Sequence, residues 1–89
     1  MEHSIFLPTL SHWEYGNEWS GERGLARFLI VPEEGQLNAE LWRGPLCRAL
    51  SQAERSARFP ISQEGLEALE RWLLEETEAL NRGNPEKAP

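Results

Sequence analysis

The stretch Leu66–Leu80, which reads LEALERWLLEETEAL, decides the fold that we predict for this chain. Its apolar side chains recur at helical spacing, and a helix turning about 100° per residue gathers them into one stripe. The stripe comprises Leu66, Leu69, Trp72, Leu73, Thr77 and Leu80. The opposite side of the helix carries Glu64, Glu67, Arg71, Glu75 and Glu78. Because such a stripe is stable only when it is buried, the sequence predicts a second layer for this helix to pack against.

Local signals set the ends of this helix. Ser62 is a suitable N-cap, whose hydroxyl accepts a hydrogen bond from a first-turn N–H. Gly65 stands where a capping box has Glu or Gln, so that second signal is missing. Gly83 fits the C′ position and a proline follows shortly after it, so we expect the helix to end there. A flexible tail over residues 84–89 is predicted to follow a single domain of residues 1–83.

The second layer is predicted from two segments with the alternating pattern of β-strands, Leu25–Val31 and Leu37–Trp42. Between them lie the turn-forming residues 32–36, which have the length of a hairpin loop. In the first strand, the residues that alternate with Arg27, Leu29 and Val31 are Ala26, Phe28 and Ile30. In the second strand, the residues that alternate with Asn38, Glu40 and Trp42 are Leu37, Ala39 and Leu41. The sequence therefore predicts an antiparallel hairpin.

The remaining segments give weaker strand signals. Trp13 and Tyr15 share one face of a predicted strand, and Gly16–Asn17 has the composition of a turn. Trp19 begins another short extended piece, and the glycines of residues 21–24 bracket a predicted loop.

Two readings of the segment 46–59 stay open. Two strands, Leu46–Leu50 and Arg58–Ile61, would give the sheet enough width to cover the helix stripe, and we prefer them; a helix over Leu46–Arg55 is the alternative. The fold class that we predict is α+β, with a small antiparallel sheet of about four or five strands, arranged as hairpins or a meander and packed by one C-terminal amphipathic helix.

The charge balance is acidic, with 15 acidic residues against 9 basic ones and a net charge of −6. Every acidic residue is Glu. Binding to nucleic acid or to an anionic membrane relies on Lys and Arg, so we expect neither partner. Cys47 is the only cysteine, so no disulfide forms within the chain. The first residues have no signal-peptide pattern, and we expect a cytoplasmic protein.

Candidate catalytic and metal-binding motifs fail for lack of partners. His12-Trp13-Glu14 resembles half of a zinc-deaminase motif, but the paired Cys-x-x-C of that motif is missing. His3, His12 and Cys47 have no spacing typical of a zinc site. We therefore predict a protein that is not an enzyme, with no cofactor and no metal.

Two groups of residues are candidates for binding a partner protein. Exposed aromatic rings of Trp13, Tyr15 and Trp19 would form a hot spot, although in so small a domain such rings more often complete the core. The acidic face of the helix, with Glu67, Glu75 and Glu78, would suit a basic partner, although a solvated face explains it as well.

Several short runs in residues 25–75 resemble small uncharacterised bacterial and prophage-type α+β proteins. The runs are Trp42-Arg43-Gly44-Pro45, then Phe59-Pro60-Ile61-Ser62, Glu64-Gly65-Leu66 and Trp72-Leu73. The resemblance implies a bacterial origin and a hairpin sheet followed by one helix, but no activity and no site residue.

Three functional hypotheses follow from the sequence. The first is a non-enzymatic binding or accessory protein that acts through protein–protein contact; one version is an inhibitor encoded by a phage or mobile element. The second is a structural homodimer, joined by an edge strand or by the helix surface around Leu74, because so short a chain buries little surface alone. The third is a small-molecule binder that uses the Trp13–Trp19 region.

Overall fold

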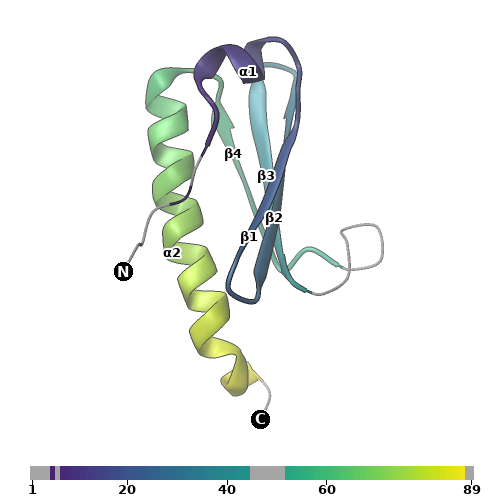
Figure 1. Cartoon of the computed structure of the whole chain (residues 1–89), viewed down its shortest axis with the longest axis vertical. Coiled ribbons are helices and arrows are strands. Elements are labelled where there is room, and N and C mark those ends of the chain that lie inside the picture. Colours follow the sequence, from purple (N-terminus) through teal and green to yellow (C-terminus); the bar gives the residue numbers. More distant parts are fainter. Residues whose placement is uncertain (1–4, 6, 45–51, 88–89) are drawn as a thin grey trace.

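A computed structural model describes residue 5, residues 7–44 and residues 52–87, with side chains as far as Arg82. The elements follow in the order α1 (Leu10–Glu14), β1 (Trp19–Arg23), β2 (Ala26–Glu33), β3 (Gln36–Arg43), β4 (Arg55–Pro60) and α2 (Gln63–Lys87). The strands form one antiparallel sheet in the order β1-β2-β3-β4, and α2 covers one of its faces (Figure 1). This arrangement confirms the predicted α+β class, with four strands in a meander.

The hairpin of β2 and β3 lies at the centre of the sheet, as predicted, but its turn is tighter than expected. Glu34 and Gly35 alone form the turn, both with positive φ (51° and 76°), as a type I′ turn requires. Pro32 therefore belongs to β2, where it faces Leu37 of β3. It is tolerated because the pairing of β1 with β2 ends at Ile30, so β1 needs no N–H from residue 32.

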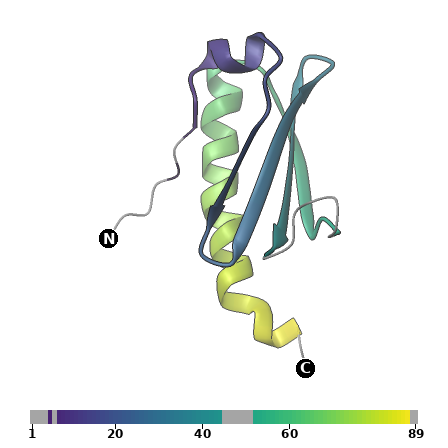
Figure 2. The same cartoon turned by 45° about the vertical axis from the view of Figure 1, so that its right-hand side comes forward.

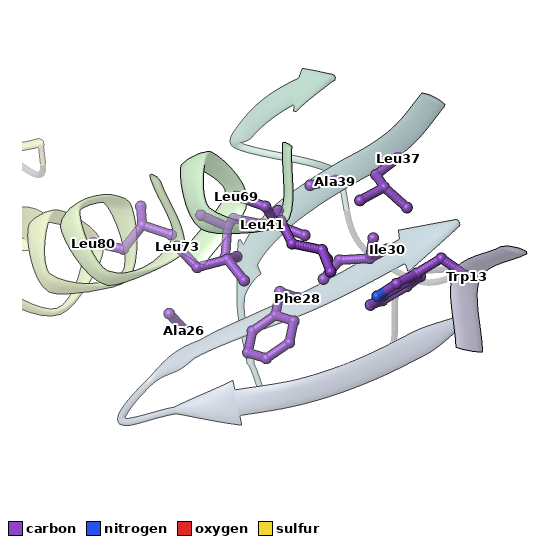
Figure 3. Close-up of a cluster of buried hydrophobic side chains, with 11 residues drawn as sticks. Trp13, Ala26, Phe28, Ile30, Leu37, Ala39, Leu41, Leu69, Leu73 and Leu80 are labelled. Carbon is purple, nitrogen blue, oxygen red and sulfur yellow. The ribbon is translucent and has the colours of Figure 1, made fainter. Parts of the chain in front are cut away.

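The core lies between α2 and the inner face of the sheet (Figure 3). On the helix, the predicted stripe is confirmed: Leu69, Leu73 and Thr77 have no exposed surface, and Trp72 packs its ring against Phe59 with ring centroids 5.9 Å apart. The sheet contributes Ala26, Phe28, Ile30, Leu37, Ala39 and Leu41. Burial of these apolar surfaces is the main stabilising contribution to the fold.

The first turn of α2 explains why Gly65 takes the place of a capping-box glutamate. Ser62 accepts a hydrogen bond from the Gly65 N–H at 3.0 Å, which confirms the predicted N-cap. The chain from β4 passes so close that a Cβ on Gly65 would overlap the Pro60 carbonyl oxygen and lie 2.8 Å from its carbonyl carbon. No side chain fits at this position unless the backbone moves.

The predicted end of α2 at Gly83 is wrong, because the helix continues to Lys87. A proline within a helix lacks one backbone donor, and it commonly bends the helix without ending it. Accordingly, the last turns of the ribbon deviate from the axis of the preceding helix (Figure 2).

The predicted strand through Trp13 and Tyr15 is also wrong, because residues 10–14 form the short helix α1. A glycine-dependent C-cap ends this helix: the N–H groups of Gly16 and Asn17 donate to the carbonyls of Trp13 (2.9 Å) and His12 (3.3 Å). Gly16 has φ +83°, which its lack of Cβ permits. The glycine that suggested a turn after a strand thus ends a helix.

Other sequence predictions have mixed outcomes. The strand beginning at Trp19 is confirmed as β1, but it includes Gly21, so the predicted loop over 21–24 is reduced to the turn at Gly24 and Leu25. The predicted strand Arg58–Ile61 corresponds to β4, which begins earlier, at Arg55. The predicted segment Leu46–Leu50 lies outside the described residues.

Asn81 of α2 holds the turn between β1 and β2. Its Oδ1 accepts a hydrogen bond from the Leu25 N–H at 2.6 Å, and its Nδ2 donates to the Arg23 carbonyl at 3.0 Å. Gly24 makes this approach feasible, because a Cβ there would lie 2.7 Å from the Asn81 amide atoms. This single side chain therefore ties the end of α2 to the β1–β2 turn.

We expect Asn81→Ala to lower the free energy of unfolding by about 2 kcal/mol, since both hydrogen bonds are lost at once. Urea unfolding followed by circular dichroism measures the change. Arg82→Ala is the matched control, because among the described residues the neighbouring Arg82 makes only an exposed ion pair with Glu78 at 3.6 Å. An equal loss in the two variants would show that Asn81 does not hold the turn.

Candidate binding surface around strand β1

A groove of about 610 Å³ lies over β1, β2 and β3 on the face of the sheet that α2 does not cover. We call it the outer groove. Its lining residues are Glu18, Ser20, Gly21, Glu22, Arg27, Phe28, Leu29 and Trp42. The alternation of the strands places these side chains, because Ser20 faces Leu29 and Arg27 faces Trp42 across neighbouring strands.

The outer groove combines an apolar floor with a charged rim. Trp42 is only 5% exposed although it lies on the face away from α2, and Leu29 is half-buried beside it. At the rim, Arg27 lies 3.4 Å from the Glu22 carboxylate, and Glu18 is exposed. Among the described residues of the rim, one arginine thus accompanies two acidic side chains, so their summed charge is negative.

A smaller hollow of about 250 Å³ lies on the opposite side of β1, and we call it the inner hollow. Its lining residues are Ile5, Trp19, Ser20, Gly21, Glu22, Arg23 and Phe28. Gly21 is central to it, since a Cβ there would come within 2.7 Å of the Phe28 ring. The missing side chain leaves the aromatic ring to form part of the lining of both hollows.

Strand β1 therefore separates two hollows at the edge of the sheet. Its inner face is fixed by Arg23, whose guanidinium donates to the Thr77 hydroxyl of α2 at 3.0 Å. Thr77 itself donates to the Leu73 carbonyl at 2.6 Å, so this buried hydroxyl has partners in both directions. The hydrogen bonds hold the short strand in place although α2 packs mainly over β2, β3 and β4.

The structure divides the predicted aromatic cluster. Trp13 is 1% exposed and belongs to the core, whereas Tyr15 is 83% exposed at the end of α1. Trp19 is half-buried on β1, with its ring edge-on to that of His12 at a centroid distance of 5.7 Å. The three rings therefore do not form one surface, and among them Trp19 alone lines a hollow around β1.

The predicted acidic candidates Glu67, Glu75 and Glu78 are exposed on α2, as expected. They lie on the other side of the sheet from the outer groove, because α2 covers the inner face (Figure 1). The structure thus does not bring them together with the groove.

The described residues include no group of three or more potential metal ligands, whereas His3 and Cys47 lie outside them. In the same part of the chain, no helix combines the length and apolar character needed to cross a membrane.

The sequence analysis missed Arg27, Leu29 and Trp42 as possible binding residues. A signal was present, because an antiparallel sheet with one solvated face should alternate apolar and polar residues. The predicted hairpin instead has apolar residues on both faces, because Leu29, Val31 and Trp42 alternate with the apolar residues that face the helix. Apolar residues on both faces of a sheet indicate that the second face also makes contacts; Trp42, at 5% exposed, already makes them within the chain, whereas Leu29 keeps part of its surface exposed. Comparison of the chain with protein-family models, with curated proteins and with solved structures found no match.

Proposed function

We propose that this protein is a non-enzymatic binding or accessory protein that acts through protein–protein contact, and that the β1 side of its sheet makes the contact. The observation that carries the proposal is the outer groove, with Trp42 and Leu29 as an apolar floor and charged side chains around them. An apolar centre with a polar rim is the usual anatomy of a protein interface. One version of this role is an inhibitor encoded by a phage or mobile element.

The two alternative functions have less support. Of the three aromatic rings that suggested a small-molecule site in the Trp13–Trp19 region, only that of Trp19 lines a hollow around β1, and the 250 Å³ of this inner hollow is below the usual range of about 300–1,000 Å³. A structural homodimer would bring two chains together that each carry a net charge of −6, which opposes self-association.

Site-specific photo-crosslinking tests the proposed function. Benzoylphenylalanine placed at the exposed Ser20, on the face of β1 that lines the outer groove, should yield a crosslink to a defined partner in the cell that expresses the gene. The same group at the exposed Glu75 of α2 is the matched control and should yield none. Mass spectrometry of the crosslinked peptide identifies the partner and the contact.

Three outcomes would contradict the proposal. Crosslinks from position 75 and none from position 20 would move the contact to the acidic face of α2. Crosslinks from position 20 to a second copy alone would favour the homodimer. Absence of crosslinks at both positions would remove the support for protein–protein contact.

A further inference from the structure

We propose that the partner binds as an extended segment that pairs with β1 and adds a strand to the sheet, and that this segment alternates basic and apolar side chains. The inference rests on the proposed function and specifies the chemistry of the partner. Strand addition derives its affinity from main-chain hydrogen bonds and its specificity from hollows that receive alternate side chains. Strand β1 has such hollows on both of its faces.

The two edges of the sheet differ in how they are protected. The edge strand β4 carries Arg55 and Arg58 and ends in Pro60, which are typical defences against strand pairing, and α2 packs on it. The edge strand β1 has no proline, its charged residues Glu22 and Arg23 already contact Arg27 and Thr77, and its centre is Gly21, which presents no side chain. Strand addition is therefore favoured at β1 over β4.

The charges around β1 select the side chains on the outer face of the added strand. Neighbouring strands lie about 4.8 Å apart, so a long side chain on the added strand reaches across β1 to the outer groove. There it meets Glu18 and Glu22, while Arg27, the one cationic group among the described residues that line the groove, is already 3.4 Å from Glu22. Lys or Arg fits this rim, whereas Asp or Glu would be repelled.

The inner hollow selects the opposite set of side chains. Ile5 and Phe28 contribute apolar surface to it, and the Arg23 guanidinium is occupied by Thr77 at 3.0 Å. A medium-sized apolar side chain, such as Val or Leu, suits a hollow of about 250 Å³. Because side chains alternate between the faces of a strand, basic and apolar residues must alternate along the segment.

A short segment of another protein fits this edge better than a second copy of the chain does. Strand β1 has only five residues, which limits pairing to a short stretch. A second copy would present its own Glu22 to the acidic rim and would add the repulsion of two chains that each carry −6. A basic segment instead gains from that charge.

Titration of the isotope-labelled full chain with the capped peptide KVKVKVK, followed by amide chemical shifts, tests the inference. We expect saturable shifts at residues 20–23 and weaker or no shifts on α2. The peptide EVEVEVE should not bind. Two further versions of KVKVKVK carry methyl groups on the backbone nitrogens, one on the lysines and the other on the valines. Each methylation pattern blocks the N–H groups along one edge of the peptide strand. We expect the version that is blocked on the edge facing β1 to lose binding.

Matched variants separate a specific site from general charge attraction. The double variant Glu18→Gln/Glu22→Gln should weaken KVKVKVK binding about tenfold at low ionic strength. The double variant Glu67→Gln/Glu75→Gln removes the same charge from α2 and should leave binding nearly unchanged. Any of three results would overturn strand addition. The two double variants could weaken binding equally, both methylated peptides could still bind, or the chemical-shift changes could centre on α2. If one of these results is obtained while benzoylphenylalanine at position 20 still crosslinks to a partner, only this inference fails and the proposed function stands.

Discussion

Replacing Gly65 by alanine should lower the free energy of unfolding by about 3 kcal/mol, the upper part of the range for an overpacked site. The added Cβ would overlap the Pro60 carbonyl oxygen, which belongs to the backbone and cannot rotate away like a side chain. Relieving the overlap requires α2 to move away from the end of β4. Because α2 carries much of the core, the cost extends beyond the turn itself.

The sign of this effect discriminates between local propensity and packing. In an exposed helix interior, Gly→Ala stabilises by about 1 kcal/mol, so helix propensity alone predicts a gain. Thermal unfolding should instead show Tm falling by at least about 10 °C for a chain of this size. The control is Glu64→Ala at the preceding, exposed position, which should change the stability by less than about 0.5 kcal/mol. A Gly65→Ala variant more stable than the parent would contradict the close approach.

Truncating Leu69 to alanine should lower the free energy of unfolding by about 3–4 kcal/mol, the second of the two largest effects. Leu69 has no exposed surface and lies between α2 and the sheet, where the lost methyl groups leave a cavity (Figure 3). Such a loss is a large part of the 5–15 kcal/mol typical of a folded domain.

The control for Leu69 is Leu74→Ala, which makes the same change on the same helix. Leu74 lies off the buried stripe and is only half-buried, so its truncation should cost about 1 kcal/mol or less. Denaturant unfolding of both variants gives the difference directly. Similar losses at the two positions would mean that α2 does not pack on the sheet through the stripe of Leu69.

Periodicity alone was sufficient to predict the main architecture. The apolar stripe of α2 and the alternation in residues 25–42 are long, consistent patterns, and both describe burial, which dominates the stability of a small domain. Ser62 as N-cap was predictable for a similar reason, since its hydrogen bond reaches only three residues along the chain.

The errors arose where tertiary contacts or single residues decide the local structure. Helix α1 spans only five residues, too few for a periodic signal, and its position depends on burying Trp13 in the core. At the other end, α2 passes the signals of Gly83 and Pro85. Neither outcome can be read from a short window of sequence, because both depend on contacts or on competition between weak local preferences.

The candidate site was less predictable than the fold. Trp13, Tyr15 and Trp19 are close in sequence, but a helix, a turn and a strand direct them to the core, to solvent and to the edge of the sheet. The outer groove instead combines Glu18 and Glu22 with Trp42, which is remote in sequence. Only the pairing of β1, β2 and β3 brings these residues together.

Amide hydrogen exchange of the full chain, alone and bound to the partner that crosslinks to position 20, tests the central claim most directly. If the β1 side of the sheet is the binding surface, exchange at residues 20–23 should slow on binding while exchange on the solvent-facing side of α2 stays the same. Slower exchange confined to residues 63–82, with β1 unaffected, would contradict the claim and place the partner on the acidic helix.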